Sequence, residues 1–203
     1  LKAFEQCSNG TAVQVCSATN SSLPDNSVDY IFTDPPFGAN IMYSELNTIA
    51  ESWLKVKTNN KEEAISNNTQ RKGIPEYQAI MTTCLKEYYR VLKPGRWMTV
   101  EFSNTSAAFW NCLQYAIQSA GFIISSVTDL NKERGGLHAM LGPTAVKQDL
   151  AISCYKPTDA LINKLEVSEN TSANVWDFVQ DLLEHLPVHL QREHTTTAVV
   201  ERS

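Results

Sequence analysis

The sequence of 203 residues lacks the features that identify several large classes of protein. No stretch approaches the ~20 consecutive apolar residues of a membrane span, and no charged and then apolar leader opens the chain. Its five cysteines are widely spaced, without a Cys-x-x-Cys pair, which argues against a disulfide framework or a zinc site. His185, His189 and His194 stand near one another, but Pro187 interrupts any helix that would align them, so we expect no metal. These absences predict a cytoplasmic protein without membrane contact.

The most informative segment is an apolar run over residues 28–33 that ends in two prolines. The run is rich in β-branched and aromatic side chains, which predicts a buried strand. Asp34-Pro35-Pro36-Phe37 follows at once. Consecutive prolines can neither continue a ladder nor enter a helix smoothly, so the strand must end there in a stiff, extended turn. The turn therefore holds a carboxylate and an aromatic ring at the carboxyl end of a strand, where α/β sheets bind their ligands.

This turn suits the attack of an amino group on a methyl donor. The exocyclic amine of adenine or cytosine is a poor nucleophile, because its lone pair is delocalised into the ring. The Asp34 carboxylate and the Pro35 carbonyl can both accept hydrogen bonds from that amine, which stabilises the charge that develops on nitrogen. Phe37 can stack on a planar base, a contact worth roughly 1–3 kcal/mol in single-strand systems. We therefore take Asp34, Pro35, Pro36 and Phe37 as the candidate catalytic residues.

The same turn resembles a known motif. Asp-Pro-Pro-Phe matches the D-P-P-[YFW] pattern of the AdoMet-dependent amino-methyltransferases, above all the adenine-N6 DNA methyltransferases. Residues 23–30 look like the usual approach to the motif strand, and residues 89–97 look like the helix end and turn before the next strand of that fold. Residues 39–46 are similar to a group of large bacterial, adenine-specific DNA methylases. The resemblance covers residues 11–157 and, more weakly, the tail.

The resemblance implies transfer of a methyl group from S-adenosyl-L-methionine (AdoMet) to the exocyclic amine of a base in DNA. It implies adenine N6 rather than cytosine N4, because the first motif residue is Asp34 and the cytosine enzymes more often carry Ser there. The base would be flipped out of the duplex and stacked on Phe37, and Asp34 would also contact the cofactor. RNA is the alternative acceptor, and the motif does not separate the two.

The order of strand and helix patterns agrees with a Rossmann-like class I methyltransferase sheet with flanking helices, an α/β fold. We expect strands at 12–16, 28–33, 97–102, 122–130 and 149–155, and helices within 38–58 and at 77–92, 105–120 and 175–186. The first helix would bury an apolar face made of Ile41, Leu46, Ile49, Trp53 and Leu54. The expected domains are a partial catalytic domain over 1–157, with a loop and helix insertion at 38–76, and an acidic helical tail over 158–203.

The glycine-rich turn with which such methyltransferases bind AdoMet is missing from the sequence. Gly135-Gly136 lies late, between two expected strands, and lacks the strand–helix context. The first two strands of the fold are missing as well, so we expect a chain that is incomplete at its N-terminus. Beyond Asp34, the cofactor contacts would then come from a missing N-terminal half or from a partner subunit. The motif strand would be left with an open edge, through which a dimer could form.

Positive charge is scarce in the chain but concentrated after the motif. The formal net charge is −5, which is unusual for a free-standing DNA binder. Residues 55–96 nevertheless carry nine Lys and Arg and four Glu. A basic loop beside the catalytic turn could contact phosphates around a flipped base; its candidate residues are Lys55, Lys57, Lys61, Arg71 and Lys72. The alternative is a solvated loop, because Glu62 and Glu63 interrupt the run.

Two functions stay open on the sequence alone. The chain is either a catalytic amino-methyltransferase domain or a non-catalytic, methyltransferase-like partner that needs another segment or subunit to bind the cofactor. The missing glycine turn favours the second function. The intact Asp-Pro-Pro-Phe turn favours the first, because a degenerate partner has no chemical need for it. Glu101 and Ser103, at the end of the neighbouring strand, could also line the pocket.

Overall fold

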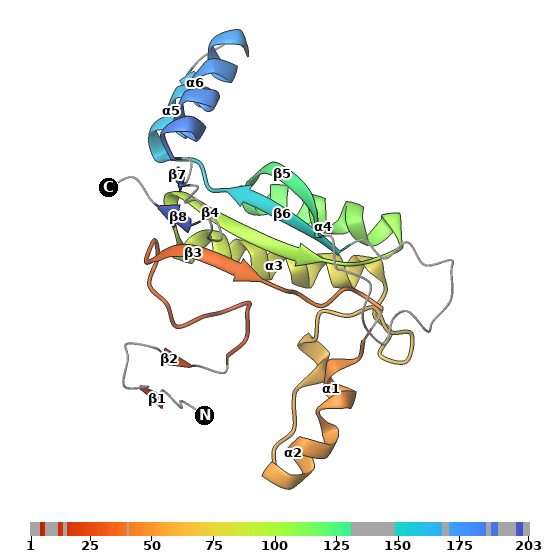
Figure 1. Ribbon diagram of the computed structural model, residues 1–203. Coiled ribbons are helices and arrows are strands. Elements are labelled where there is room, and N and C mark those ends of the chain that lie inside the picture. Colours follow the sequence, from red (N-terminus) through yellow and green to blue (C-terminus); the bar gives the residue numbers. More distant parts are fainter. Residues whose placement is uncertain are drawn as a thin grey trace.

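The computed structural model describes residues 5–6, 12–13, 16–39, 41–130, 149–167, 171–185, 188–190 and 198–200. Its centre is a four-stranded sheet in the order β3-β4-β6-β5 (Figure 1). The strands are β3 (Val28–Thr33), β4 (Leu92–Phe102), β5 (Ile123–Leu130) and β6 (Asp149–Tyr155). β3 and β4 run parallel, and β6 pairs antiparallel with both β4 and β5. The sheet and its helices confirm the mixed α/β class predicted from the sequence.

The motif strand β3 lies at an edge of this sheet. Among the described residues only β4 pairs with it, which agrees with the expected open edge. Its side chains alternate: Ile31 packs against the core, whereas Tyr30 and Phe32 on the other face are 53% and 61% exposed. The outer backbone groups of β3 and these two rings therefore form a surface that the described chain leaves open.

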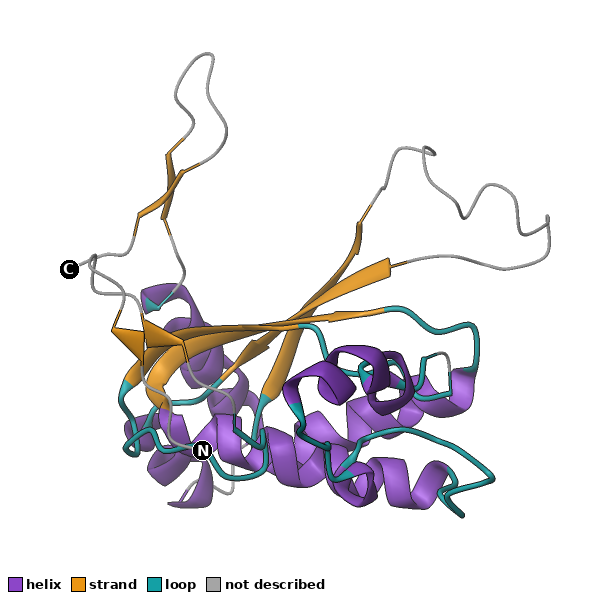
Figure 2. Cartoon of the chain, turned by 90° about the horizontal axis from the view of Figure 1, so that it is seen from below, coloured by secondary structure: helices purple, strands orange, loops and turns teal. Residues whose placement is uncertain are grey.

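Two long helices cover the core-facing side of the sheet (Figure 2). They are α3 (Ile74–Val91) and α4 (Ala107–Ala120). α3 follows the predicted 77–92 pattern closely, and α4 ends at Gly121, which adopts a left-handed φ of +105°. Between helices and sheet lie the fully buried side chains Tyr77, Leu85, Met98, Val100, Phe102, Leu113, Ile117 and Ile152. The periodicity of the sequence therefore identified the core helices.

The connection between α3 and β4 differs from the expected turn. Lys93-Pro94-Gly95 was expected to separate the helix from a strand that begins at Trp97, but β4 already begins at Leu92. The pairing with β3 shifts register between Val28 and Tyr30, and Gly95 adopts φ +74° there. The chain thus accommodates the proline and glycine as an irregular start of β4 instead of a separate loop.

A buried lysine holds this junction together. Lys156, directly after β6, is only 5% exposed. Its ammonium group donates to the carbonyls of Tyr89 and Leu92, both at 2.6 Å, and to Asn26 Oδ1 at 2.8 Å. A cation at this place complements the carbonyl groups at the C-terminus of α3. Burial lowers the pKa of Lys156, while the charges of Asp159 and Asp25 oppose that shift.

The segment after the motif forms an arm that projects from the carboxyl edge of the sheet (Figure 1). The single helix expected within 38–58 is instead two short helices, α1 (Tyr43–Leu46) and α2 (Thr48–Leu54), followed by the 3₁₀ turn η1 (Asn60–Glu62). The apolar face expected to be buried is exposed: Ile41, Leu46, Ile49, Trp53 and Leu54 are 41%, 67%, 75%, 84% and 71% exposed. The sequence has the amphipathic pattern of a helix, but no element of the described chain packs against the apolar face that this pattern produces.

The remaining elements lie outside the main sheet. β1 (Glu5–Gln6) and β2 (Ala12–Val13) pair antiparallel, so the strand expected at 12–16 is shorter and belongs to a separate sheet. The helices α5 (Asp159–Val167) and α6 (Thr171–Glu184) follow β6, and β7 (Val188–Leu190) pairs with β8 (Ala198–Val200). The connection 131–148, with Gly135-Gly136, lies outside the described residues. In the part of the chain that the structure describes, no helix has the length and apolar character needed to cross a membrane.

The tail helix α6 is attached to the main sheet by its last turn. Asp181 accepts hydrogen bonds from Tyr155 Oη at 2.6 Å and from Thr158 Oγ1 at 2.7 Å. Trp97 Nε1 donates to the carbonyl of His185 at 3.0 Å. These contacts cover the end of the sheet opposite to the motif. The division into domains at 1–157 and 158–203 stays a prediction. The proposed boundary falls in the short connection between the end of β6 at Tyr155 and the start of α5 at Asp159.

Candidate active site

The motif turn leaves the sheet at Thr33 as the sequence predicts. Asp34-Pro35-Pro36-Phe37 has no regular structure, and Gly38 completes the turn at φ +90°. Gly38 is buried, and a Cβ placed on it would overlap the ring of Phe109 in α4. A side chain at this position therefore conflicts with both the backbone conformation and the packing. The glycine lets the turn approach α4 closely.

Three segments hold the backbone of the turn. Tyr77 Oη of α3 donates to the carbonyl of Pro36 at 2.7 Å, and Asn104 Nδ2 donates to the carbonyl of Phe37 at 2.5 Å. The Ser66 amide donates to the carbonyl of Gly38 at 3.1 Å. Within the described part of the chain, no hydrogen bond to the Pro35 carbonyl is found. The carbonyls of Pro36, Phe37 and Gly38 are thus occupied, whereas that of Pro35 has no donor among the described residues.

Tyr77 and Asn104 belong to the candidate site but do not stand out in the sequence as site residues. Tyr77 begins the amphipathic pattern of a helix, and nothing in that pattern marks its hydroxyl group. Asn104 had a signal, because it stands two residues after Phe102 at the carboxyl end of the strand beside the motif strand. Its side-chain oxygen accepts from the Ser106 amide at 2.7 Å, which fixes the orientation in which Nδ2 faces Phe37.

A cavity of about 290 Å³ opens beside the turn. It is lined by Thr33, Asp34, Pro35 and Pro36 of the motif, by Tyr43, Glu62, Glu63 and Ala64 of the arm, by Ile80, Met81, Cys84, Leu85 and Tyr88 of α3, and by Ser17, Ala18, Thr19 and Val100. Its volume suits a planar base or part of a nucleoside. The structure therefore brings three of the four candidate catalytic residues into one cavity.

Phe37 is the exception among the four, because it does not line this cavity. Its ring is half-buried against the core and meets the ring of Phe102 edge to face, with centroids 5.3 Å apart. Phe102 in turn meets Trp110 in the same manner at 4.9 Å. Glu101 and Ser103 do not line the cavity either.

The charge of the cavity is acidic. Asp34, Glu62 and Glu63 all line it. Glu63 accepts hydrogen bonds from the amide and hydroxyl groups of Ser44, at 3.0 and 2.6 Å, so its carboxylate is fixed. Burial raises the pKa of Tyr43, and the charges of Asp34 and Glu63 raise it further. Such a cavity favours a cation or an amine donor and disfavours a phosphate group.

The basic residues expected to contact phosphates lie on the arm and the loop after it. Lys55, Lys57, Lys61 and Arg71 are exposed. Lys72 is different: it is only 8% exposed, and its ammonium group donates to the carbonyls of Asn60 and Glu63, both at 2.7 Å. Burial lowers its pKa, against the opposing charge of Glu63. Lys72 fixes the arm internally, so its assignment as a phosphate contact is corrected.

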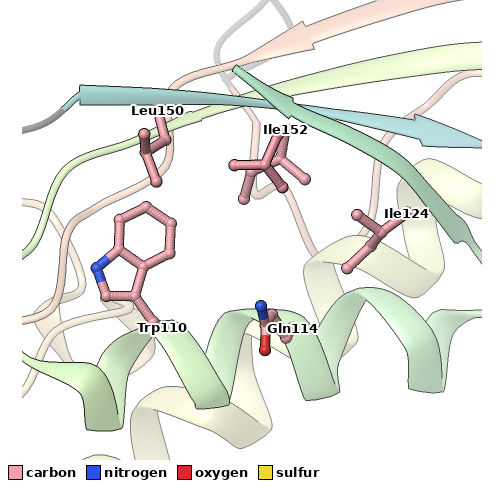
Figure 3. Close-up of a pocket in the computed structure, with 6 residues that line it drawn as sticks. Trp110, Gln114, Ile124, Leu150 and Ile152 are labelled. Atoms are coloured by element: carbon pink, nitrogen blue, oxygen red, sulfur yellow. The ribbon is translucent and has the colours of Figure 1, made fainter. Parts of the chain in front are cut away.

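A second cavity of about 290 Å³ lies between α4 and the hairpin of β5 and β6 (Figure 3). Trp110 and Gln114 face it from α4, and Ile124, Val127, Leu150 and Ile152 face it from the strands. Trp110 Nε1 donates to the carbonyl of Asn104 at 2.7 Å. The lining holds no group that could take part in acid–base or nucleophilic chemistry.

The histidines do not form a cluster in the described chain. His185 Nδ1 lies 2.7 Å from the carbonyl of Asp181, whereas His194 and the side chain of His189 lie outside the described residues. Among the described residues, no group of three or more metal-ligating side chains is found.

Comparison with known families bears directly on the motif turn. A family model described as DNA methylase matches residues 28–197, which is most of the chain. The chain belongs to this DNA methylase family. The match confirms the predicted class, an AdoMet-dependent amino-methyltransferase of the D-P-P-[YFW] type, within the group that modifies adenine N6 or cytosine N4. No curated protein sequence matches the chain.

Solved structures similar to this DNA methylase chain are distant. A putative DNA modification methylase from Thermus thermophilus shares 15% identity at a TM-score of 0.39, over 70% of this chain and 53% of its own. The cytosine-N4-specific PvuII DNA methyltransferase shares 14% at 0.41, over 67% and 46%. A SAM-dependent methyltransferase from Methanosarcina mazei shares 13% at 0.38, over 72% and 67%. This chain thus spans about half the length of the first two, and TM-scores this low add nothing to the family match.

Proposed function

We propose that the protein transfers a methyl group from AdoMet to the N6 amine of adenine in DNA. The observation that carries this proposal is the motif turn, in which Asp34 and Pro35 line one cavity while the carbonyls of the next two residues, Pro36 and Phe37, are already bound. The amine of the base has two protons to donate. We assign the Asp34 carboxylate and the Pro35 carbonyl as the acceptors of these two protons.

The chemistry assigned to this chain is orientation and charge stabilisation. When both hydrogen bonds form, the nitrogen lone pair is directed away from the ring and towards the methyl group. Positive charge that develops on nitrogen is stabilised by the Asp34 carboxylate, which also accepts the proton that the amine loses. The contacts from Tyr77, Asn104 and Ser66 keep the acceptors in place, so little reorganisation is needed.

The residues present fit AdoMet in part. AdoMet supplies an activated methyl group on a positively charged sulfonium, and the cavity beside Asp34 carries three carboxylates. Asp34 is the residue that we propose for contact with the cofactor. The described chain has no glycine-rich turn for the remaining contacts. We propose that they come from a segment or subunit that pairs along the open edge of β3 and covers Tyr30 and Phe32.

The DNA duplex is proposed to contact the arm. Lys55, Lys57, Lys61 and Arg71 are exposed in the segment that begins at the end of α2 and passes the acidic cavity. Phosphates contacted there would position the duplex without reading its sequence. The acidic cavity itself would exclude phosphate groups and admit a base that is flipped out of the stack. The basic residues of the arm would thus bind the phosphate backbone of the DNA, and the acidic cavity would receive the base.

The test is a methylation assay with labelled AdoMet on unmethylated plasmid DNA, followed by mass spectrometry of the nucleosides. We expect N6-methyladenine from the protein as its gene encodes it. Asp34→Asn should lower kcat by about 10²–10⁴-fold, because it removes the charge and one acceptor position. Asp29→Asn is the matched control: it changes the same side chain at the other end of β3, where Asp29 pairs with Lys93 at 2.7 Å, and should leave kcat unchanged.

The product decides between the alternatives. N4-methylcytosine would overturn the choice of base, and methylation of RNA but not DNA would overturn the choice of acceptor. Activity of the full gene product without activity of the 203-residue chain would support a cofactor site completed from elsewhere. Absence of methylation by both would leave the non-catalytic partner as the function.

A further inference from the structure

The two ends of the arm lie side by side next to the motif turn (Figure 1). Gly38, directly after the motif, forms a parallel bridge with Ile65, and its carbonyl accepts from the Ser66 amide at 3.1 Å. The returning end of the arm is packed into the protein, since Ile65 is fully buried and Ala64 is 9% exposed. The outgoing end is packed less well, since Ile41 is 41% exposed. The place of the outgoing end therefore depends on contacts with the returning end.

Ser44 and Glu63 join the two ends of the arm by a pair of hydrogen bonds. The amide and hydroxyl groups of Ser44 donate to the two oxygens of the Glu63 carboxylate, at 3.0 and 2.6 Å. Hydrogen bonds to a charged acceptor are roughly twice as strong as those between neutral groups. A second contact joins Asn67 Nδ2 to Met42 Sδ at 3.1 Å, and a thioether sulfur is a weak acceptor. The Ser44–Glu63 pair is therefore the stronger of these two connections.

The Ser44–Glu63 pair belongs to the wall of the cavity beside the motif turn. Tyr43 of the outgoing end and Glu63 of the returning end line this cavity together with Asp34. Lys72 donates to the carbonyl of Glu63 at 2.7 Å, so the backbone of the returning end is held independently of the carboxylate. Loss of the Ser44–Glu63 pair would thus release the outgoing end while the returning end stays in place.

The basic residues proposed to contact DNA lie between the two members of this pair along the chain. Lys55, Lys57 and Lys61 are all exposed. Phosphates bound by these side chains are connected to the motif turn only through the two ends of the arm. Because the Ser44–Glu63 pair joins those ends, it would fix the position of the bound duplex relative to the acceptors of the turn.

We propose that Glu63 is a positioning residue, which acts through Ser44 to hold the arm in a fixed place relative to the motif turn. This role rests on the proposed function and deepens it, because it connects the DNA contacts of the arm with the cavity for the base. Productive geometry needs reacting atoms roughly 3–3.5 Å apart, and a misplacement of roughly 1 Å can cost about 10²-fold in rate. Glu63 therefore acts on the chemical step more than on the affinity for DNA.

The experiment measures kcat and the KM for DNA in Ser44→Ala, Glu63→Gln and the double variant. It uses the protein as its gene encodes it, unmethylated plasmid DNA and labelled AdoMet. Each single variant should lower kcat by about 10–100-fold and leave the KM within about threefold, because the lysines of the arm are unchanged. The double variant should be no slower than the slower single variant, because both substitutions act on the same pair.

The arm contains a second pair of the same kind, which provides the matched control. The amide of Thr58 donates to the Glu51 carboxylate at 3.0 Å, and its hydroxyl group donates to the other oxygen of that carboxylate. These bonds are exposed to solvent, and neither residue lines the cavity. Thr58→Val removes a hydroxyl group from this pair as Ser44→Ala removes one from the other. It should leave kcat within about twofold of the parent value.

Unfolding midpoints separate positioning from a general loss of stability. Thr58→Val and Ser44→Ala each remove one hydrogen bond from the arm and should lower the midpoint by a similar small amount. Equal losses of kcat in these two variants would overturn the specific role of the Ser44–Glu63 pair. Full kcat in Ser44→Ala together with a slow Glu63→Gln would also overturn it, because Glu63 would then contact the ligand directly.

The parent protein and Asp34→Asn separate this role from the proposed function. A parent protein that methylates DNA, and that loses activity in Asp34→Asn, confirms the proposed function whatever Ser44→Ala does. Full kcat in both Ser44→Ala and Glu63→Gln would then overturn the role of Glu63 alone. No methylation by the parent protein would overturn the proposed function and this role with it.

Discussion

At the scale of single residues, the site depends on groups that hold the backbone of the motif turn more than on reactive side chains. Tyr77, Asn104 and Ser66 occupy the carbonyls of Pro36, Phe37 and Gly38 in order. The Pro35 carbonyl is the one to which the described residues donate no hydrogen bond. Under the proposed function, the preference of the turn for an amine would arise from which of its carbonyl groups are already bound.

Gly38 offers a test of how tightly the turn is packed. Gly38→Ala should lower the free energy of unfolding by roughly 2–4 kcal/mol, because the new Cβ meets Phe109 and the φ of +90° is unfavourable for alanine. Gly73→Ala is the control, since φ there is −98° and the nearest atom is a flexible Glu76 oxygen at 3.3 Å. Urea denaturation of both variants measures the difference. Equal losses would show that the contact with Phe109 is easily relieved.

At the scale of elements, the sequence predicted the core and missed the surroundings of the site. The strand at β3 and the helices α3 and α4 follow from local periodicity, which a residue's neighbours along the chain determine. The burial of Lys72 depends on carbonyls of Asn60 and Glu63, which are brought to it by the fold of the arm. Tyr43 and Asp34 likewise line one cavity only because the fold of the arm brings them together. Such contacts leave no periodic pattern in one sequence.

The loop before β3 is attached to α3 by an ionic network that titrates. Glu87 accepts from Arg90 and from the amide and hydroxyl groups of Ser21, and Arg90 also pairs with Asp25. The bond from Arg90 is the main cause that lowers the pKa of Glu87 from 4.5 to about 2, against the effect of burial. This carboxylate is therefore more acidic in the folded chain than in the unfolded chain.

The direction of this shift predicts the pH dependence of stability. The contribution of Glu87 is fully present above pH 4.5 and is lost as the pH falls towards 2, because the unfolded chain takes up the proton first. In Glu87→Gln this part of the dependence should vanish, so the urea midpoint should fall less between about pH 5 and about pH 3 than in the parent chain. A fall of the same size in both would show that other carboxylates carry the acid sensitivity.

At the scale of the whole molecule, the net charge of −5 limits how strongly the chain can bind DNA. With Lys72 excluded, four basic residues of the arm remain: Lys55, Lys57, Lys61 and Arg71. Four phosphate contacts correspond to a slope of about −4 in a plot of log affinity against log salt concentration. The slope is therefore expected to be no steeper than about −4. With a slope near this limit, the affinity would fall strongly between low and physiological salt concentration.

Two lysine variants test the proposed contacts of the arm with DNA separately from the internal structure of the arm. Lys57→Ala should make the slope shallower by about 1 and leave the free energy of unfolding unchanged, because the side chain is exposed. Lys72→Met should leave the slope unchanged and cost about 1–3 kcal/mol of stability, because the carbonyls of Asn60 and Glu63 lose their donor. Binding titrations at several salt concentrations, with unfolding curves, measure both. A change of slope in Lys72→Met would return that residue to the DNA interface.

The hydrogen bonds that fix the backbone of the motif turn also have a consequence for the synthesis of the protein. The three groups found to donate to carbonyls of the turn, from Ser66, Tyr77 and Asn104, all lie later in the chain than the turn, and Asn104 follows Phe37 by 67 residues. At roughly 5–20 residues per second, a ribosome needs about 3–13 seconds to add that length. The turn is therefore synthesised several seconds before Asn104. A nascent chain that already contains Asp-Pro-Pro-Phe cannot hold the Phe37 carbonyl in its final place until translation has passed the end of β4.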